Sequence, residues 1–377
     1  MGLRMLLRSA LSVCLLLILP NYALADHGPK KMWKRQIQPY FTAHQTGKMG
    51  PFSINVHSHG QEKTISLPVK QNKAFDKIFK DRLNLAAILR DKGAVTYTRF
   101  NQKRGIDANT LLHGMSMSKT ALAAAAGSLL CSGEIKSLDD SMGAYSKSLN
   151  NTPYAKVSIK NVLQMNSGVS PLNDGGKKKA NRMAMGLAEF EGKADLVAAV
   201  NMFNKTLRKQ GTQHNYHSAD PFALSVLITE ITGKPASQVF YENVYSKFAK
   251  GGQIHWAADK KGYTVSQARL VMKASDWSDF GQYILDEIKA KSCLGNFFED
   301  GRKNAVPTKR KNVKYGYQFW VYTINGESVI TMTGHGGFFN ILSQKKNKVL
   351  SIFSVDENYK AGNLFANLPG IVSKVMK

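Results

Sequence analysis

The chain has 377 residues, of which 43% are hydrophobic, so it can bury a large core in one or two compact domains. This composition excludes a disordered chain. It carries 52 lysine and arginine residues against 26 aspartate and glutamate residues, a formal net charge of +26. Aromatic residues are not interleaved with the basic ones, so the charge does not predict nucleic-acid binding.

The first 25 residues have the layout of a secretory signal peptide. Arg4 and Arg8 precede an apolar run over 11–19, and Ala23-Leu24-Ala25 supplies a small-residue cleavage site before Asp26. The apolar run is too short for a good membrane span. We therefore expect a protein at 26–377 that is exported to the periplasm or outside the cell, with no transmembrane span once the signal is removed. Loss of the two arginines leaves a formal charge of +24.

The excess positive charge is concentrated in patches that are expected to be loops or tails: Lys30-Lys31 with Lys34-Arg35, Lys177-Lys178-Lys179, and Lys309-Arg310-Lys311 with Lys314. Outside the cytoplasm, such patches favour anionic lipid head groups or cell-wall polymers as neighbours. Solubility and general surface charge explain them equally well.

Two cysteines, Cys131 and Cys293, remain after the signal peptide. An oxidising compartment allows them to pair, but spacing alone does not show whether their Cα atoms come close enough. The sequence leaves the pairing open, with a bridge as the less favoured alternative. His57 and His59 resemble a metal-binding pair. Because no third ligand is near, a surface strand is the better interpretation, and we expect no metal or organic cofactor.

In chain order, an irregular lead-in over 26–73 is followed by a predicted helix over 75–83 and a hairpin with strands at 85–89 and 94–98. Ser116 and Lys119 come next, three residues apart. On a helix, this spacing puts both side chains on one face, about a turn apart. A buried helix is predicted from the apolar run 121–131 and should end near Gly133. It would desolvate the lysine amine and so let it act as a base toward the serine.

The motif Ser-x-x-Lys is weak evidence by itself, because average composition yields about one or two copies by chance. A second copy, Ser343 to Lys346, lies in a polar run between two strand-like stretches. A solvated turn is the better interpretation there.

The middle of the chain is predicted to be mostly helical. Expected elements are short helices over 138–142 and 157–163, an exposed loop over 170–181, and helices over 187–208, 221–232 and 237–248. Asp220 and Pro221 would cap and open the helix over 221–232. Tyr216 therefore lies on a turn that leads into a helix and can hold a phenol in place. The rival Tyr241-Glu242-Asn243 lies in an amphipathic helix and is interpreted as structural.

The last third predicts a helix over 277–288, a basic loop, and an antiparallel meander with strands at 315–322, 328–332, 341–343 and 349–355. Asn325-Gly326 is a two-residue turn signal. Gly336 and Gly337 permit close backbone approach, so a strand amide there can help the Ser116 amide hold an oxyanion. A plain corner or bulge is nearly as common a role for such glycines.

Three short motifs, in this order, resemble the serine beta-lactamase and penicillin-binding superfamily: Ser116-Met117-Ser118-Lys119, Tyr216-His217-Ser218 and His335-Gly336-Gly337. Further short segments are similar to one branch of this superfamily, which includes class C beta-lactamases, family VIII esterases and 6-aminohexanoate-dimer hydrolases. These segments are Asn166-Ser167-Gly168-Val169, Trp256 with Asp259 and Gly262, Asp276 with Phe280-Gly281, and Tyr315 to Trp320. The similarity extends over roughly 83–355.

The resemblance implies an α/β (α+β) fold, with an antiparallel sheet flanked by helices and built from both chain ends. The α/β part would cover roughly 75–120 and 250–377, and an inserted, mostly helical part roughly 121–249. It also implies site roles. Ser116 would be the acylated nucleophile, Lys119 its base and Tyr216 a proton shuttle. The backbone amides of Ser116 and Phe338 would form the oxyanion hole. Substrate-binding positions would be Ser218, His335, Gly336 and Gly337.

This sequence departs from the lactamase pattern at several positions. His335 stands where lactamases have lysine, and Gly336 and Phe338 replace hydroxyl side chains that help hold the lactam carboxylate. Ser218 replaces an asparagine, and Phe338 suggests an apolar acyl pocket. We therefore expect an exported serine hydrolase that cleaves ester or linear amide bonds in a small molecule or short peptide. D-alanyl-D-alanine carboxypeptidase or weak beta-lactamase activity is the second hypothesis. A catalytically silent basic protein that binds the cell surface is the third.

Overall fold

The computed structural model describes residues 48–49, 52–58, 64–68, 70–80, 83–169, 174–184, 186–250, 252–355 and 368–376. The predicted signal peptide, the basic residues at 30–35 and His59 lie outside these ranges. His57 lies on a strand, as expected.

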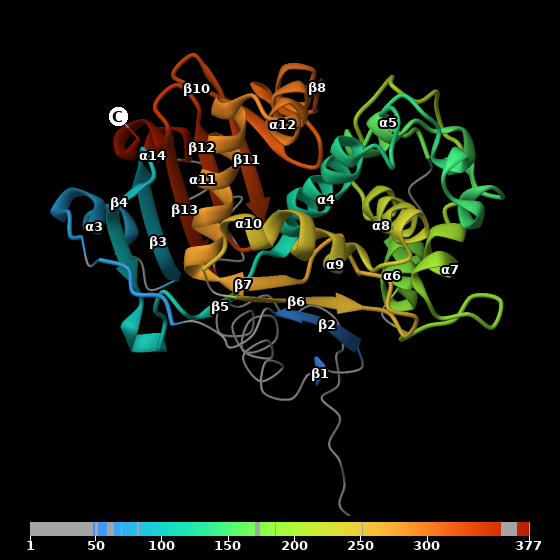
Figure 1. Cartoon of the computed structure of the whole chain (residues 1–377), viewed down its shortest axis with the longest axis horizontal. Helices are drawn as coiled ribbons and strands as arrows, with labels where there is room; N and C mark the ends of the chain where they lie inside the picture. Colours follow the sequence, from blue (N-terminus) through green and yellow to red (C-terminus); the bar gives the residue numbers. More distant parts are fainter. Residues whose placement is uncertain are drawn as a thin grey trace, which may run out of the picture.

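The larger of two sheets combines strands that lie before and after the inserted helical region, as the resemblance implied (Figure 1). All its described pairings are antiparallel. In spatial order the strands are β4 (Ala94–Phe100), β3 (Asn84–Asp91), β13 (Lys348–Ser354), β12 (Phe338–Ser343), β11 (Glu327–Gly334), β10 (Trp320–Ile324), β9 (Val313–Tyr315) and β8 (Val306–Pro307). The predicted hairpin and meander are confirmed.

Two tight turns follow the sequence signals. Lys92 and Gly93, with φ of 51° and 85°, join β3 to β4, and Asn325 and Gly326, with φ of 51° and 76°, join β10 to β11. Positive φ at both central residues suits the right-handed twist of the flanking strands. The continuous strand predicted over 315–322 is wrong, because a turn over 316–319 divides it into β9 and β10.

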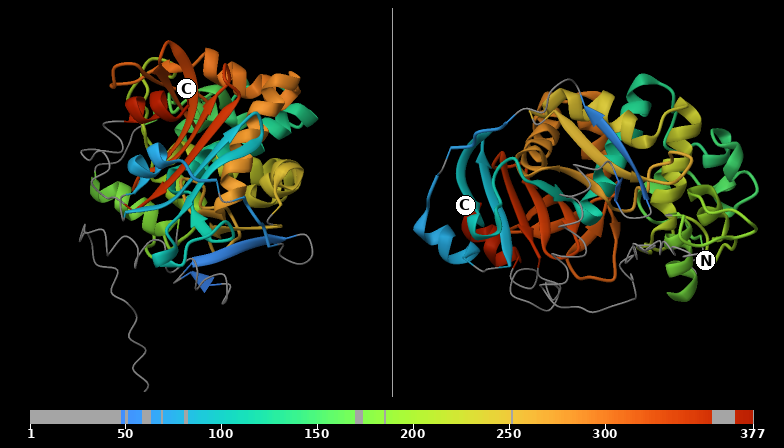
Figure 2. Two further views of the ribbon diagram at one scale, coloured as in Figure 1. Left: turned by 90° about the vertical axis from the view of Figure 1, so that its left-hand side faces the viewer. Right: turned by 90° about the horizontal axis from the view of Figure 1, so that it is seen from below.

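Both faces of this sheet are covered by helices. Neighbouring residues on β3 point to opposite faces: Ile88 joins the core beneath α11 (Ala274–Ala290), and Leu89 joins the core beneath α3 (Lys73–Phe79) and α14 (Leu368–Val375). The two views of Figure 2 show the early strands and the late strands side by side in this one sheet.

A second sheet, which the sequence analysis did not predict, lies below the first in Figure 1. Its antiparallel strands in order are β1 (Lys48–Met49), β2 (Phe52–Ser58), β6 (Gln253–Ala258), β7 (Leu270–Lys273) and β5 (Leu111–His113). Because β5 ends at His113, shortly before Ser116, this sheet fixes where the segment that carries Ser116 begins.

The inserted region is mostly helical and contains α4 (Ser118–Ser132), α5 (Ile159–Leu163), α6 (Asp174–Met183), α7 (Leu196–Asn201), α8 (Ala219–Thr232), α9 (Ala236–Phe240) and α10 (Ser246–Phe248). The helix α4 is buried along most of its length and ends at Gly133 in the left-handed conformation, as predicted.

Several predicted elements in this region are wrong. The segment over 138–142 forms turns, with a 3-10 helix beginning only at Met142, and the helix over 187–208 shrinks to α7, which Asp195 caps by accepting from the amide of Ala198. The loop predicted over 170–181 contains α6, because Ala180 and Met183 bury one face of that polar stretch. A further helix, α12 (Cys293–Lys303), lies within the stretch expected to be a loop.

A disulfide joins Cys131 and Cys293, whose Cα atoms are 5.7 Å apart, so the pair that the sequence left open, and favoured less, is formed. The bond links the end of α4 to the start of α12. Leu294 and Phe297 of α12 also pack closely around Gly127 of α4. Sequence spacing did not reveal this contact, because the two helices meet only through tertiary packing.

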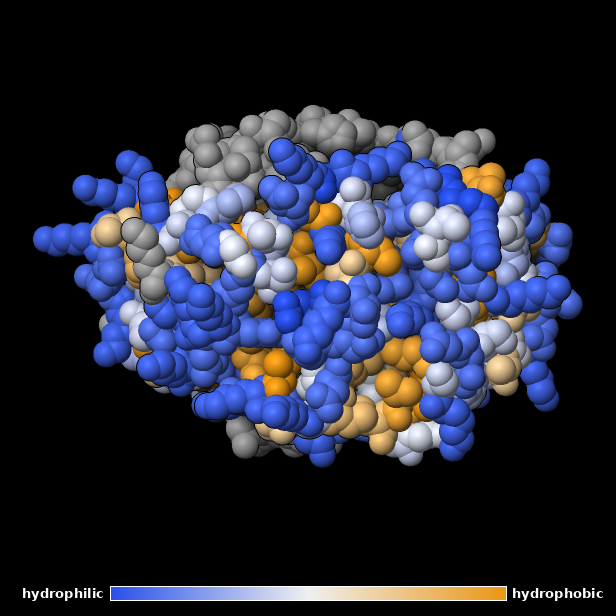
Figure 3. Space-filling view, turned by 90° about the horizontal axis from the view of Figure 1, so that it is seen from above, coloured by the Kyte–Doolittle hydropathy of each residue, from blue (hydrophilic) through white to orange (hydrophobic). Residues whose placement is uncertain are grey.

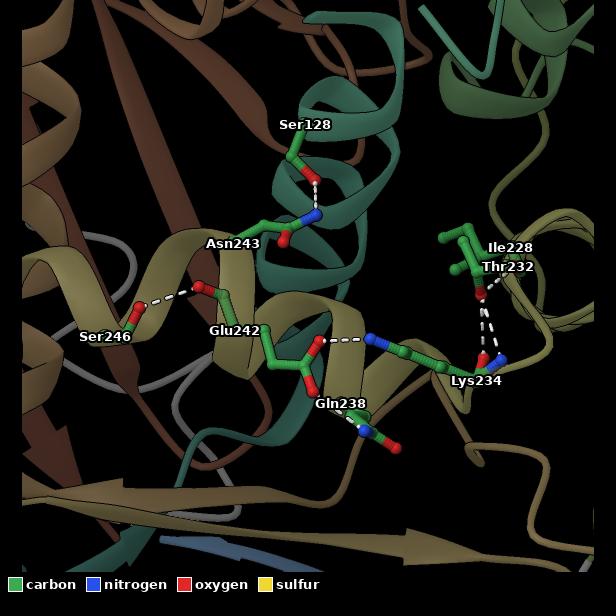
Figure 4. A network of polar contacts seen from close by, with 8 residues as sticks. All are labelled: Ser128, Ile228, Thr232, Lys234, Gln238, Glu242, Asn243 and Ser246. Carbon is green, nitrogen blue, oxygen red and sulfur yellow. Dashed lines mark hydrogen bonds and ion pairs between the residues drawn. The ribbon is translucent and has the colours of Figure 1, made fainter. Parts of the chain in front are cut away.

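The rival Tyr-x-Asn motif has a structural role. Residues Tyr241–Tyr245 form a π-helical turn between α9 and α10, and the Asn243 amide donates to Ser128 Oγ on α4 over 3.1 Å (Figure 4). In the same figure, Glu242 accepts from Lys234 and Gln238. Tyr241 is buried against His57. These contacts stabilise the back of α4, away from its first turn.

Candidate active site

Ser116 lies in a 3-10 turn, Met115–Met117, that leads directly into α4. The residue before it, Met115, has a φ of 49°, an uncommon conformation for a non-glycine residue. Two hydrogen bonds hold it: its amide donates to His113 Nδ1 over 3.0 Å, and its carbonyl accepts from Ser118 Oγ over 2.7 Å. Such strain persists only where the surroundings over-determine it, and it aims Ser116 out of the turn.

Close packing fixes the same segment from behind. A Cβ on Gly114 would lie 2.1 Å from the ring of buried Trp277, so a larger residue does not fit there. The Trp277 indole donates to the carbonyl of Leu112 over 2.9 Å. The nucleophile segment therefore rests directly on α11.

Lys119 lies next to Ser116, as the spacing predicted. Its Nζ atom is 3.1 Å from Ser116 Oγ and also donates to the backbone carbonyl of Gln267. The lysine is only 3% exposed. Ser116 is half-buried, so water and substrate reach the hydroxyl more readily than the amine.

Gln267 is a site residue that the sequence analysis missed. It belongs to the segment between β6 and β7, where the amide of Leu270 also donates to Ser118 Oγ over 3.0 Å. The contact with Lys119 is made by a backbone carbonyl, which any residue type would supply. No side-chain signal in the sequence was available to find it.

Tyr216 comes from the turn before α8, and folding brings its ring to Lys119. The lysine Nζ lies 5.0 Å from the ring centroid. Trp320 stacks on the same ring with centroids 5.3 Å apart, and Tyr315 meets it edge-on at 5.8 Å. The phenol is 39% exposed. Folding thus brings Tyr216, about one hundred residues away in the sequence, to the neighbouring pair Ser116 and Lys119.

A buried carboxylate supports the turn that carries Tyr216. Asp220 accepts from Tyr154 OH over 2.7 Å and from Ser167 Oγ over 2.8 Å, and its Oδ1 lies 3.5 Å from His217 Nε2. Burial raises the pKa of Asp220 and lowers that of His217. The capping role predicted for Asp220 is wrong: Ser218 occupies the N-cap position, and Asp220 binds inward.

His214 is a second site neighbour that the sequence analysis did not single out. Its ring lies 4.8 Å from that of Tyr315 and 5.8 Å from that of Trp320. Burial and the nearby charge of Arg310 lower its pKa to about 4. It is therefore a neutral, packed ring at neutral pH and supports the aromatic group around Tyr216.

The end of β11 meets the nucleophile segment. A Cβ on Gly334 would lie 2.7 Å from the carbonyl oxygen of Gly114 and 2.9 Å from Met115 Cβ, so the two backbones are in close contact. Gly334 pairs with Phe338, the first residue of β12. The proposed oxyanion amides of Ser116 and Phe338 therefore come from two segments that pack together, and Gly334 provides the close approach.

Gly336 and Gly337 lie at a corner of the larger sheet, close to the Ser116 segment. They form the turn between β11 and β12, with φ of 90° and 88°. His335 is exposed on this turn, and Ser218 is half-buried at the start of α8. Phe338 is fully buried with its ring edge-on to Phe353, so it does not line an acyl pocket, and that expectation is wrong.

Within the described ranges, no group of three or more His, Cys, Asp or Glu side chains is arranged to hold a metal ion. A search of the same residues finds no helix with the length and apolar character that a membrane crossing requires. Figure 3 shows one face of the molecule, where hydrophilic residues predominate and hydrophobic ones show in separate patches.

The antiparallel sheet with its flanking helices and the helical region beside it define a beta-lactamase-like α/β fold. Residues 73–361 match the protein family described as Beta-lactamase, and the chain belongs to this family of serine hydrolases. A comparison with curated proteins found no match.

Solved structures agree on the fold at low sequence identity. A candidate 6-aminohexanoate-dimer hydrolase from Bacillus anthracis is 17% identical, with a TM-score of 0.72 over 90% of this chain and 95% of that one. A penicillin-binding protein from Bacillus halodurans is 15% identical, with a TM-score of 0.61 over 81% and 99%. A family VIII carboxylesterase is 13% identical, with a TM-score of 0.55 over 75% and 89%.

Proposed function

We propose that this protein is an exported serine hydrolase that cleaves ester or linear amide bonds through an acyl-enzyme on Ser116. The observation that carries the proposal is the 3.1 Å contact between Lys119 Nζ and Ser116 Oγ, with the lysine almost completely buried. A serine hydroxyl needs an adjacent base, and a lysine amine shielded from water can act as one.

In the acylation step, Ser116 Oγ attacks the carbonyl carbon of the substrate while Lys119 takes the hydroxyl proton. Collapse of the tetrahedral intermediate breaks the bond to the leaving alcohol or amine, which receives that proton. Tyr216, whose ring lies 5.0 Å from the lysine amine, is the proposed shuttle for it. In deacylation, water attacks the acyl carbon, gives a proton to the same relay and releases Ser116 and a carboxylic acid.

The backbone amides of Ser116 and Phe338 are the proposed donors to the developing oxyanion. The contact between Gly334 and the Gly114-Met115 backbone supports this assignment, because it holds both segments at fixed positions. Preorganised donors of this kind stabilise the negative charge that forms on the carbonyl oxygen.

Esters and linear amides are favoured over beta-lactams because of the residues that replace the lactamase pattern. Gly336 and Phe338 offer no hydroxyl, and Phe338 is fully buried. We propose that His335, exposed on the turn after β11, Ser218 and the two glycines contact substrate. D-Alanyl-D-alanine carboxypeptidase or weak beta-lactamase activity is the second candidate, favoured by the Ser-x-x-Lys arrangement itself. A catalytically silent basic binding protein of the same fold is the third.

Export to the periplasm or outside the cell is supported by two observations. The first 25 residues have the layout of a signal peptide, and Cys131 and Cys293 form a disulfide. Disulfides persist mainly in oxidising compartments.

A fluorophosphonate probe tests the proposed nucleophile. We expect covalent labelling of the folded protein that is absent in Ser116→Ala, because only an activated serine reacts. Ser343→Ala is the matched control: Ser343 belongs to the second Ser-x-x-Lys, donates to Glu327 over 2.8 Å, and should leave labelling intact. Absence of labelling in the native protein, or labelling that survives in Ser116→Ala, would contradict the proposal and favour the silent binding protein.

A side-by-side substrate panel then separates the two enzymatic candidates. It contains short-chain nitrophenyl esters, a D-Ala-D-Ala peptide and a chromogenic cephalosporin. Turnover of the esters with little turnover of the cephalosporin is the expected result. Preference for the D-Ala-D-Ala peptide would make the carboxypeptidase the correct assignment.

A further inference from the structure

The basic segments of this chain are not spread evenly over the surface, because two of them lie at the candidate active site. Arg310 belongs to the segment between β8 and β9, and Lys177 belongs to α6. The charge of Arg310 lowers the pKa of His214, and the charge of Lys177 lowers the pKa of His217. These two histidines flank Tyr216 in the sequence, so positive charge approaches the candidate site from two sides.

Arg310 is held against the site by ring stacking. Its guanidinium carbon lies 5.1 Å from the ring centroid of Trp320, which itself stacks on Tyr216. The opposite end of this stack is the Lys119 amine. Successive contacts thus link the exposed Arg310 through Trp320 and Tyr216 to Lys119, the proposed catalytic base.

The backbone around Arg310 is ordered by its own hydrogen bonds. Thr308 Oγ1 accepts from the Arg310 amide over 3.1 Å and donates to the Val313 carbonyl over 2.7 Å. The Val313 amide donates to the Arg310 carbonyl over 3.3 Å. A guanidinium that is already positioned loses less conformational entropy when it binds a ligand.

The described carboxylate that acts on His217, one of these two histidines, is buried. Among the described groups whose charges act on His214 and His217, Asp220 is the one carboxylate, and it is fully buried and already accepts from Tyr154 and Ser167. The positive charge of Arg310 acts on His214, and that of Lys177 acts on His217. The electrostatic potential near Tyr216 therefore favours an approaching anion.

We propose that the acyl donor carries a carboxylate or phosphate group, which the Arg310 guanidinium binds beside Trp320. The inference rests on the proposed hydrolase function and narrows its substrate class. A planar guanidinium suits both anions, because it can donate two parallel hydrogen bonds to their oxygens. Lys177, on α6, attracts the same anion by its charge, but an ammonium group does not offer the two parallel hydrogen bonds of a guanidinium.

Two matched pairs of esters test the proposal. The first pair is the nitrophenyl ester of pentanoate and the nitrophenyl monoester of glutarate, which has the same chain length but ends in a carboxylate. The second pair is acetoxybenzoate and its methyl ester, which places the charge on the leaving group instead. For at least one pair, we expect Arg310→Ala to lower kcat/KM for the charged member about five- to tenfold, mainly through KM, and to leave the neutral member unchanged.

Two further variants show whether the effect depends on the position of the charge and on the planar shape of the guanidinium. Lys289→Ala removes the same charge from an exposed position near the end of α11 and should change neither pair. Arg310→Lys retains the charge and loses the planar guanidinium, so it should keep only part of the preference. Equal kcat/KM losses for the charged and neutral esters in Arg310→Ala, or no loss for either pair, would overturn the proposal.

Anion binding has a readout that does not need turnover. Titration with glutarate and, separately, with inorganic phosphate should change tryptophan fluorescence in a saturable way in the native protein. The change should be lost in Arg310→Ala and in Trp320→Phe, and the tighter of the two anions identifies the group. An unchanged titration in Arg310→Ala would overturn the anion site even if the protein is an active hydrolase. Failure of fluorophosphonate labelling would instead remove the hydrolase function and leave any measured anion site standing.

Discussion

The two sides of the candidate active site are held in place by different forces. On the nucleophile side, Ser116 and Lys119 sit at the start of a buried helix, and Gly114 is pressed against Trp277 with no room for a side chain. On the opposite side, Tyr216 is 39% exposed and is positioned by stacked rings and by the hydrogen bonds of Asp220. Close packing fixes the first side, and polar and aromatic contacts fix the second.

This difference indicates which side tolerates change. Packed cores respond strongly even to one added methyl group, because their side chains have no space to move. The Tyr216 side is open to solvent, so substrate can reach it. We therefore expect substitutions behind Ser116 to disturb the fold more than substitutions of the exposed side chains around Tyr216.

The largest expected effect comes from removing the proposed acid-base groups on the two sides. Lys119→Ala and Tyr216→Phe should each lower kcat by on the order of a thousandfold, because proton transfer would lose its base or its shuttle. Tyr216→Phe keeps the ring that stacks on Trp320, so its thermal stability should match that of the native protein. Steady-state kinetics on the preferred ester measures kcat for both variants. An unchanged kcat in either variant would remove that residue from the mechanism.

A smaller effect is expected from the support beneath Tyr216. Asp220→Ala leaves the hydroxyls of Tyr154 and Ser167 buried without their acceptor, which should cost about 3 kcal/mol of stability. Asp220→Asn keeps an acceptor oxygen and removes a charge whose pKa burial already raises, so it should cost clearly less. Urea unfolding measures both variants. Equal stability of the native protein and Asp220→Ala would show that this network does not hold the turn.

The smallest effect concerns pH and the aromatic group. The pKa of His214 is about 4 in the folded chain against an ordinary value of 6.5, so the unfolded chain binds the extra proton first as the pH falls. Acidification through this window therefore destabilises the fold, by roughly 2 kcal/mol between pH 7 and pH 5. Thermal unfolding of the native protein and of His214→Phe at both pH values measures it. The variant should lose less stability on acidification, and equal losses would show that His214 does not titrate as described.

The sequence predicted the elements whose signals are local. Asn325-Gly326 marked a turn, Gly133 ended α4, and two strand-like runs on either side of Lys92-Gly93 marked β3 and β4. The contact between Ser116 and Lys119 followed from helical spacing alone. The proximity of Tyr216 was an expectation from resemblance, and the structure places its ring beside the lysine.

Features that depend on tertiary contacts were not predicted. Lys119 binds the backbone carbonyl of Gln267, and since every residue type has such a carbonyl, the sequence does not indicate this contact. The disulfide needed the positions of α4 and α12, and α6 was missed because its glycines and lysines are typical of a loop. Asp220 has the residue type of a helix cap but binds Tyr154 and Ser167 in the interior. Burial decided each of these cases, and single-sequence patterns report burial only indirectly.

The order of strands in the large sheet has a consequence for the growing chain. Leu89 of β3 pairs with Leu350 of β13, so the sheet that holds Phe338 beside the nucleophile segment closes only after almost the whole polypeptide has been made. Contacts between such distant positions form late and slowly. A partly synthesised chain that already contains Ser116, Lys119 and Tyr216 still lacks one of the proposed oxyanion donors. If the proposed mechanism is correct, full activity is therefore expected only after the last strands have folded.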